Sequence, residues 1–160
     1  MVIQQGIHAP VWGTVNPNEN IKLFFAGYTL FVKADSVGRW RTRLPVLKAW
    51  GPYEMLISGK KKIAYHNVMV GEVWLASGQS NMSFAIDRPM LNAKQIIAGA
   101  NFPLIREFRN PQRCNSYPEQ ETVGDWKVCT PQNAGSFSAV AYFFARKISA
   151  EQHVAVRIIN

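Results

Sequence analysis

The stretch V-G-E-V-W-L-A-S-G-Q-S-N-M, residues 70–82, decides the fold of this chain. Residues 73–76 form an unbroken apolar run that ends abruptly in small polar residues. A short apolar run closed by a polar turn predicts a strand that is buried on both faces, as in the parallel sheet of an α/β domain. Open sheets of this class bind ligands at the carboxyl ends of their strands, so we expect a site in the turn.

Ser80 lies in that turn and is the candidate nucleophile. We expect a helix to begin over Asn81–Ile86, so that its N–H groups could stabilise an oxyanion beside the Ser80 hydroxyl. A serine at such a place is commonly only a turn residue. Two related motifs are absent, because Met82 replaces the second glycine of the α/β-hydrolase elbow and no lysine follows Gly78 as in a phosphate loop.

Longer strings of the sequence carry a more specific signal. They are G-E-V-W-L-A-S-G-Q-S-N-M from Gly71, D-W-K-V-C-T-P from Asp125, F-S-A-V-A-Y-F-F from Phe137 and P-V-W-G-T from Pro10. Together they resemble the sialate O-acetylesterases, which belong to the SGNH or GDSL-like serine esterases. The resemblance spans nearly the whole chain.

The resemblance implies a set of site residues. Ser80 would be the nucleophile that takes the acetyl group from an O-acetylated sugar, and its backbone N–H would be an oxyanion donor. Gln79 and Asn81 would shape the turn and contact the substrate. Gly135 is the internal glycine that could supply a second oxyanion donor, although a plain loop role suits it as well. The substrate would be O-acetylated sialic acid, and no cofactor is expected.

The catalytic base of the resembled family is missing. Its Asp-x-x-His motif does not occur here, because the three aspartates are followed three residues later by other residues: Asp35 by Gly38, Asp87 by Met90 and Asp125 by Val128. His153 stands between a predicted helix and a strand, and we do not expect it to be the base. The resemblance therefore implies an amino-terminal fragment that is inactive alone.

Two alternatives stay open at this point. The tryptophans and the missing base favour a non-catalytic carbohydrate-binding or interaction module. Within the esterase class, a xylan or other polysaccharide acetylesterase is a close rival, because the nucleophile string does not encode the sugar.

Residues 1–68 are predicted to form a β-sandwich domain, incomplete at its start, from short strands at roughly ten-residue spacing. The expected strands include residues 21–26 and 29–34 around a hairpin at Gly27, then 39–44, 53–57 and 63–68. We interpret Trp12 and Trp40 as core residues, while the place of Trp50 is left open.

Residues 69–160 are predicted to form a truncated α/β domain of the flavodoxin-like, SGNH-hydrolase type, with a parallel sheet. The expected elements are a helix over 91–98, a strand over 104–108, a long loop over 110–133, a helix from about 137 and a buried strand over 154–159. Ser136 is the predicted N-cap of the second helix. Its predicted buried stripe is Phe137, Val140, Ala141, Phe144 and Ile148.

The amino-acid composition limits the classes of protein to which the chain can belong. Of the 160 residues, 48% are apolar and 18% charged, so a packed core is feasible. No apolar run approaches the ~20 residues of a membrane span, and no signal peptide is visible. The net charge of +8 includes basic clusters at residues 39–43, 60–62 and 106–113, which we read as solvated faces because no nucleic-acid-binding motif occurs. The alternative is a basic surface that favours acidic glycans.

The cysteine and metal signals are weak. Cys114 and Cys129 either form a disulfide or stay as two free thiols, and no metal-binding spacing exists. The oligomeric state is not encoded in any recognisable pattern. The family resemblance implies a periplasmic, secreted or lysosomal location.

Overall fold

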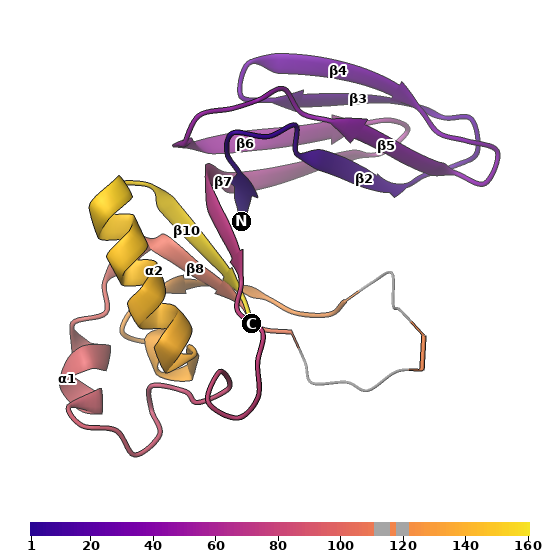
Figure 1. Ribbon diagram of the computed structural model, residues 1–160. Helices are drawn as coiled ribbons and strands as arrows, with labels where there is room; N and C mark the ends of the chain where they lie inside the picture. Colours follow the sequence, from indigo (N-terminus) through magenta and orange to yellow (C-terminus); the bar gives the residue numbers. More distant parts are fainter. Residues whose placement is uncertain (111–115, 118–121) are drawn as a thin grey trace. The chain divides into compact units, whose positions relative to one another are not determined.

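The computed structural model describes residues 1–110, 116–117 and 122–160 (Figure 1). It divides into two compact units. The first comprises Met1 and residues 3–71, and the second comprises Val2 and residues 72–160. Among the described helices, none is long and apolar enough to cross a membrane.

The first unit is built from strands alone. They are β1 (Val2–Gln4), β2 (Pro10–Thr14), β3 (Asn20–Phe25), β4 (Tyr28–Lys33), β5 (Arg39–Arg43), β6 (Trp50–Ser58) and β7 (Lys62–Leu75). Val2 of β1 and residues 72–75 of β7 belong to the second unit. Strands β4, β3, β6 and β7 pair in that order, while β2 and β5 form a separate antiparallel pair. One buried apolar cluster draws on both groups, including Leu23, Phe25, Trp40, Met55 and Val68. The β-sandwich assignment itself stays a prediction.

The hairpin predicted around Gly27 is confirmed. Strands β3 and β4 pair with Phe25 opposite Tyr28, so only Ala26 and Gly27 make the turn. Both have positive φ, 50° and 85°. Turns of this kind match the twist of the flanking strands, and glycine adopts positive φ without a steric cost.

The two tryptophans interpreted as core residues lie on opposite faces of the β2–β5 pair. Trp40 is 6% exposed, as predicted, but Trp12 is 66% exposed, so that prediction is wrong. Gly13 pairs with Trp40, and a Cβ on Gly13 would stand 3.1 Å from the indole Nε1 of Trp40. Because side chains alternate along a strand, an inward Gly13 and Trp40 turn Trp12 outward. Trp50 is also exposed.

Strand β7 corrects a second prediction. The segments predicted as separate strands, residues 63–68 and 73–76, lie along one 14-residue strand that ends just before Ala76. Asn67 has a positive φ of 55° but does not end the strand, which stays paired with β6 at Val68 and Val70. The cross-strand pairing overrides the local turn signal of Asn67, and β7 runs through both units.

The second unit is a mixed sheet with two helices and a short 3₁₀ turn. Its elements are the end of β7, α1 (Ala93–Ala98), β8 (Phe102–Phe108), β9 (Trp126–Cys129), the 3₁₀ helix η1 (Ala134–Ser136), α2 (Ala139–Gln152) and β10 (Ala155–Ile159). The sheet order is β7-β10-β8-β9, in which β10 and β8 are parallel and β8 and β9 antiparallel. The predicted parallel pairing is therefore present, with an antiparallel strand at one edge.

The end of β7 is a strand, but it is not buried on both faces. Trp74 is 41% exposed and Leu75 is 73% exposed. Trp74 packs edge-on against Phe144 of α2, with ring centroids 5.0 Å apart. Successive residues of a strand point to opposite faces. Leu75 consequently faces away from α2, and no described element of the second unit buries it.

Strand β9 lies inside the segment predicted as loop over 110–133. Trp126 pairs with Phe108, and their rings lie 4.9 Å apart. Arg157 of β10 stacks on the Trp126 ring at 3.9 Å. These partners are distant in sequence, so the strand arises from tertiary pairing that local composition does not show. Parts of the predicted loop, residues 111–115 and 118–121, fall outside the described residues.

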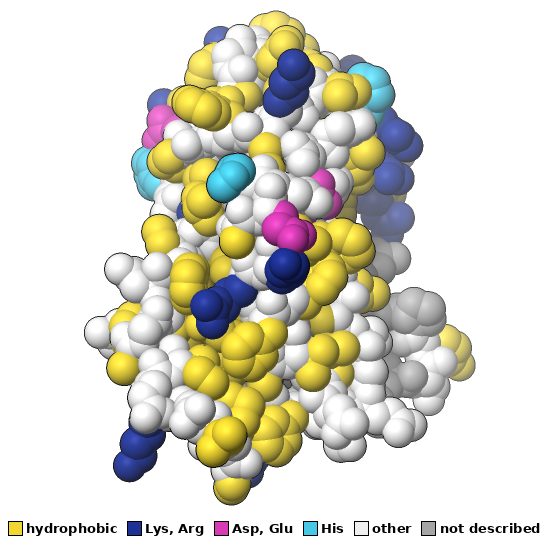
Figure 2. Space-filling model, turned by 60° about the vertical axis from the view of Figure 1, so that its left-hand side comes forward, with side chains coloured by type: hydrophobic (Ala, Val, Ile, Leu, Met, Phe, Trp, Pro, Cys, Tyr) yellow, Lys and Arg dark blue, Asp and Glu magenta, His cyan; other side chains and the backbone are white. Residues whose placement is uncertain are grey.

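Helix α2 begins later than predicted and buries only part of the predicted stripe, since Phe137 and Ala141 are buried and Ile148 packs against the core. Its N-cap is Ser138, whose Oγ accepts from the N–H of Ala141 at 3.3 Å, and Ser136 belongs to η1 instead. The buried residues of α2 are Ala139, Ala141, Tyr142 and Ala145. Val140 and Phe144 are exposed. Figure 2 shows hydrophobic side chains gathered on this side of the second unit.

Candidate active site at the carboxyl end of β7

Ser80 lies in an exposed turn five residues after β7 ends. The N–H groups of Met82 and Ser83 both donate to the carbonyl of Gln79, at 3.0 and 3.3 Å, which closes one helical turn. No helix follows over residues 81–86, so that prediction is wrong, because Ala85 instead forms a β-bridge with Ser138. Residues 77–81 are exposed, and the Ser80 hydroxyl has no hydrogen-bond partner within the described residues.

The turn is tightly shaped around Gly78. A Cβ built on Gly78 would stand 3.0 Å from the Cβ of Met82. Any larger residue would therefore press on Met82 and shift the turn that presents Ser80. Gln79 and Asn81, the predicted substrate contacts, flank Ser80. Their side chains form no hydrogen bond with any described residue.

The chain after Ser80 is fastened to the segment before α2. The N–H of Ile86 donates to the carbonyl of Phe137 at 3.1 Å, and the N–H of Ala139 donates to the carbonyl of Phe84 at 2.8 Å. On the other side of the turn, the N–H of Ala76 donates to the carbonyl of Ile159 at 2.7 Å. The fold thus joins two of the sequence strings, those around Ser80 and Phe137, which are separated by more than fifty residues.

Gly135, the candidate second oxyanion donor, lies in η1. Its carbonyl accepts a hydrogen bond from the N–H of Asp87 at 3.0 Å. A Cβ on Gly135 would meet the side chains of Asp87 and Ile97 at 3.5 and 3.6 Å, which is ordinary contact. The structure connects Gly135 to the loop that follows Ser80, and among the described residues no hydrogen bond joins Gly135 to Ser80 itself.

The sequence reasoning missed the buried carboxylate of Glu107. This side chain is 4% exposed, and one of its oxygens accepts from the Ser138 N–H at 3.2 Å and from the Asn160 amide Nδ2 at 3.0 Å. Burial raises the pKa of the Glu107 carboxyl, while these two bonds and the charges of Arg109 and Lys127 lower it in part. The sequence signal that could have indicated this role is the single acidic residue within the predicted strand 104–108.

Glu107 joins three elements beneath the Ser80 loop. It stands near the carboxyl end of β8, Asn160 follows β10, and Ser138 caps α2. The N–H of Asn160 also donates to the carbonyl of Phe108 at 3.0 Å. This network fixes the N-terminus of α2 on the sheet, and through the bridge between Ala85 and Ser138 it holds the loop that follows Ser80.

The structure places no histidine as a base in this loop. His8 lies in the first unit, with Nδ1 3.0 Å from the carbonyl of Leu44, and His66 pairs with Glu54 at 2.9 Å. His153 caps the carboxyl end of α2 with a φ of 53°. A 14-residue helix is roughly 21 Å long, so His153 lies far from the Ser138 end that contacts the Ser80 loop.

The cysteines and possible metal ligands are the remaining candidates for chemistry. Cys129 is a free and buried thiol, and its Sγ lies 3.8 Å from the carbonyl of Ala100. Burial raises the pKa of the Cys129 thiol to about 11. Cys114 lies outside the described residues. No group of three potential metal ligands occurs among the described residues.

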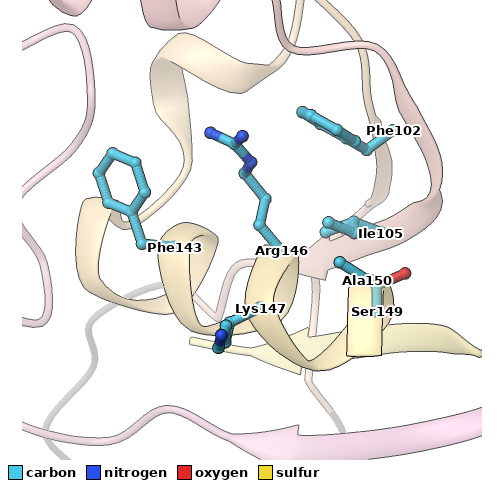
Figure 3. Close-up of a pocket in the computed structure, with 7 residues that line it drawn as sticks. All are labelled: Phe102, Ile105, Phe143, Arg146, Lys147, Ser149 and Ala150. Atoms are coloured by element: carbon cyan, nitrogen blue, oxygen red, sulfur yellow. The ribbon is translucent and has the colours of Figure 1, made fainter. Parts of the chain in front are cut away.

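An open pocket of about 450 Å³ lies beside the middle of α2, at the start of β8. Arg146 extends between Phe102 and Phe143, and its guanidinium carbon is 4.8 Å from the centroid of the Phe102 ring (Figure 3). None of the residues that line this pocket belongs to the Ser80 turn, so the two are separate features of the second unit.

Comparisons with known proteins agree on one class. The chain is 27% identical to human sialate O-acetylesterase over 92% of its length, and 26% identical to the mouse enzyme over 86%. A carbohydrate acetylesterase from Xanthomonas citri superposes on 99% of the chain with a TM-score of 0.96 and 39% identity. The chain spans about a third of the length of these relatives, 32%, 29% and 37% respectively. No protein-family model matches.

Proposed function

The chain belongs to the sialate O-acetylesterase family, and on that premise we propose that it carries the nucleophile of a carbohydrate O-acetylesterase, Ser80. The observation that carries the proposal is the exposed Ser80 hydroxyl, in a turn that follows a sheet strand and is fastened to the N-terminus of α2. Its position at the carboxyl edge of the sheet is where α/β folds bind ligands.

The proposed reaction passes through an acetyl-enzyme. The Ser80 Oγ attacks the acetyl carbonyl while its proton moves to a base, and the Ser80 N–H holds the resulting oxyanion. The tetrahedral intermediate collapses, the ester C–O bond breaks, and the base returns the proton to the departing sugar oxygen. Water then hydrolyses the acetyl-serine to acetate. Gln79 and Asn81 flank the acetyl group, and Gly135 N–H is the candidate for a second oxyanion donor.

The base in this proposal is the histidine of an Asp-x-x-His segment that the 160 residues do not contain. None of the three histidines here suits the role, because two have partners within the first unit and His153 lies at the far end of α2. A serine hydroxyl without a base is a weak nucleophile. We therefore expect the chain alone to release acetate at close to the background rate.

The proposed substrate is O-acetylated sialic acid, and acetylated xylan is the rival within the class. The names of the curated relatives support the first, whereas the Xanthomonas relative is named only as a carbohydrate acetylesterase. The proposal also includes a β-sandwich for the first unit, which follows from the spacing of its short strands. It includes a periplasmic, secreted or lysosomal location as well, which follows from the family resemblance.

A chimera tests the proposed substrate. This chain would replace the matching segment of the Xanthomonas relative, which supplies the remaining polypeptide, and kcat/KM would be measured on both acetylated substrates. Preferential release of acetate from O-acetylated sialic acid supports the proposal. Preference for xylan would select the rival, and no release from either substrate by a folded chimera would leave a non-catalytic carbohydrate-binding module as the better account.

A further inference from the structure

The outer face of the β2–β5 pair carries a regular set of side chains. The register sets Pro10 opposite Arg43, Trp12 opposite Arg41 and Thr14 opposite Arg39. All six side chains are exposed. Residues that alternate along a strand share a face, so this face presents Trp12 within a row of three arginines, which we name the Trp12 face.

The packing beneath fixes this arrangement. The opposite face holds Gly13 and the buried Trp40, so a one-residue slip of β2 against β5 would bring Trp12 into the core and expose Gly13. Hydrogen bonds close both ends of the pair, from Leu44 N–H to the carbonyl of Ala9 and from Val15 N–H to the carbonyl of Gly38. The register and these hydrogen bonds therefore determine which side chains the Trp12 face presents.

The charge of this face is not neutralised within the described residues. Among the described residues, no ion pair joins Arg39, Arg41 or Arg43 to a carboxylate. Residues 1–71 contain nine lysines and arginines against three acidic residues, so they carry +6 of the net charge of +8. Figure 2 shows Lys and Arg side chains gathered along one margin of the first unit.

The three acidic residues of this unit are engaged elsewhere. Glu19 accepts from the backbone N–H groups of Asn16 and Lys60, and Asp35 accepts from those of Val37 and Arg39 in the turn before β5. Glu54 pairs with His66. The guanidinium groups on the Trp12 face are therefore available to bind anions from outside the unit.

We propose that the Trp12 face binds a carboxylate-bearing glycan, separately from the Ser80 turn. Guanidinium groups bind carboxylates through paired hydrogen bonds, and arginines at alternate positions repeat every ~7 Å along a strand, which suits a polymer with one carboxylate on each sugar. The exposed indole offers a rigid apolar surface for the C–H face of a pyranose ring.

Single-stranded nucleic acid is the rival ligand, because it also combines anions with stacking groups. Proteins that bind it stack successive bases on several aromatic side chains. The Trp12 face has one aromatic residue among six, so the observations favour the glycan. The choice of a glycan also rests on the proposed function, since the family acts on carbohydrates.

Binding to polysialic acid tests the inference, with dextran and a thymidine oligonucleotide as comparison probes. We expect polysialic acid to bind at least about tenfold more tightly than either probe. Trp12→Ala and Arg41→Ala should each weaken this binding about tenfold. Arg41→Lys should weaken it several-fold, because lysine keeps the charge but lacks the planar guanidinium group that donates two hydrogen bonds to one carboxylate. Lys61→Ala, which removes an exposed charge from a turn of the same unit, should change the affinity less than twofold.

Two results would overturn the inference. One is unchanged polysialic acid binding by Trp12→Ala and Arg41→Ala proteins whose circular dichroism matches the parent. The other is tighter binding of the oligonucleotide with the same dependence on Trp12. The assay involves no ester hydrolysis, so Trp12-dependent binding without esterase activity in the chimera would retain this inference and reject the proposed function. Esterase activity in the chimera without Trp12-dependent binding would support the proposed function and reject this inference.

Discussion

The backbone N–H of Ser138 donates to the buried carboxylate of Glu107 at 3.2 Å, across thirty-one residues of sequence. This bond ties the first turn of α2 to the end of β8. Asn160 donates to the same oxygen, so one carboxylate oxygen holds two elements that meet below the Ser80 loop. The position of that loop depends on a group that is costly to bury when charged.

Replacing Glu107 by leucine should destabilise the second unit. The change leaves the buried Ser138 N–H without its acceptor, which typically costs about 1–3 kcal/mol, and it removes a second hydrogen bond from the partly buried Asn160 amide. Urea denaturation measures the change in the free energy of unfolding. An Asp87→Leu control, at an exposed position, should have a much smaller effect. Equal losses from both changes would show that Glu107 has no special anchoring role.

The stability of the chain relative to Glu107→Gln should depend on pH. Burial raises the folded-state pKa of Glu107 above its ordinary value of 4.5, so the folded state binds the proton more tightly than the unfolded state. As the pH falls toward this raised pKa from above, the parent should therefore gain stability relative to the glutamine variant. Parallel denaturation series between pH 4.5 and 8 measure the difference. A difference that is constant with pH would contradict the assigned burial of the charge.

Ser138→Ala should cost about 1 kcal/mol, the usual value for an N-cap, because its Oγ accepts from the Ala141 N–H. Ser77→Ala, at an exposed position in the loop after β7, serves as the matched control and should be nearly neutral. Thermal or urea denaturation of both variants decides the point. A larger loss from Ser77→Ala would remove the N-cap assignment.

Cys129 should react slowly with alkylating reagents in the folded chain. Its thiol is buried, and its pKa of about 11 leaves almost no thiolate at pH 8. Peptide mapping after timed iodoacetamide treatment follows Cys129 by itself. We expect native labelling at least about a hundredfold slower than labelling in guanidinium chloride, and similar rates in both conditions would contradict the burial.

Local patterns in the sequence predicted the identity of many elements. The strands predicted over residues 39–44, 104–108 and 154–159 from period-two alternation or apolar runs are found at residues 39–43, 102–108 and 155–159. The hairpin predicted around Gly27 is likewise present, with its turn at Ala26 and Gly27. The sequence around Ser80 correctly predicted an exposed turn after a strand. An apolar run indicates the strand and the small polar residues after it indicate the turn, so neither prediction needs information from distant parts of the chain.

The errors came from interactions between distant parts of the chain. Strand β9 depends on pairing of Trp126 with Phe108, and the face of Trp12 depends on the register between β2 and β5. The stripe of α2 was misjudged because Val140 and Phe144 are apolar yet exposed, and apolar spacing alone cannot distinguish two apolar faces of one helix. Glu107 was missed because its partners, Ser138 and Asn160, become neighbours only in the fold.

The most direct test of the central claim is acetate release by the chimera with the Xanthomonas relative, compared between Ser80→Ala and Ser77→Ala. Both serines are exposed and lie three residues apart in the same loop, so the pair separates nucleophilic attack from loop packing. We predict that Ser80→Ala lowers kcat at least about a thousandfold, whereas Ser77→Ala keeps it within about threefold. A Ser80→Ala chimera that released acetate as fast as its parent would contradict the assignment of Ser80 as the nucleophile.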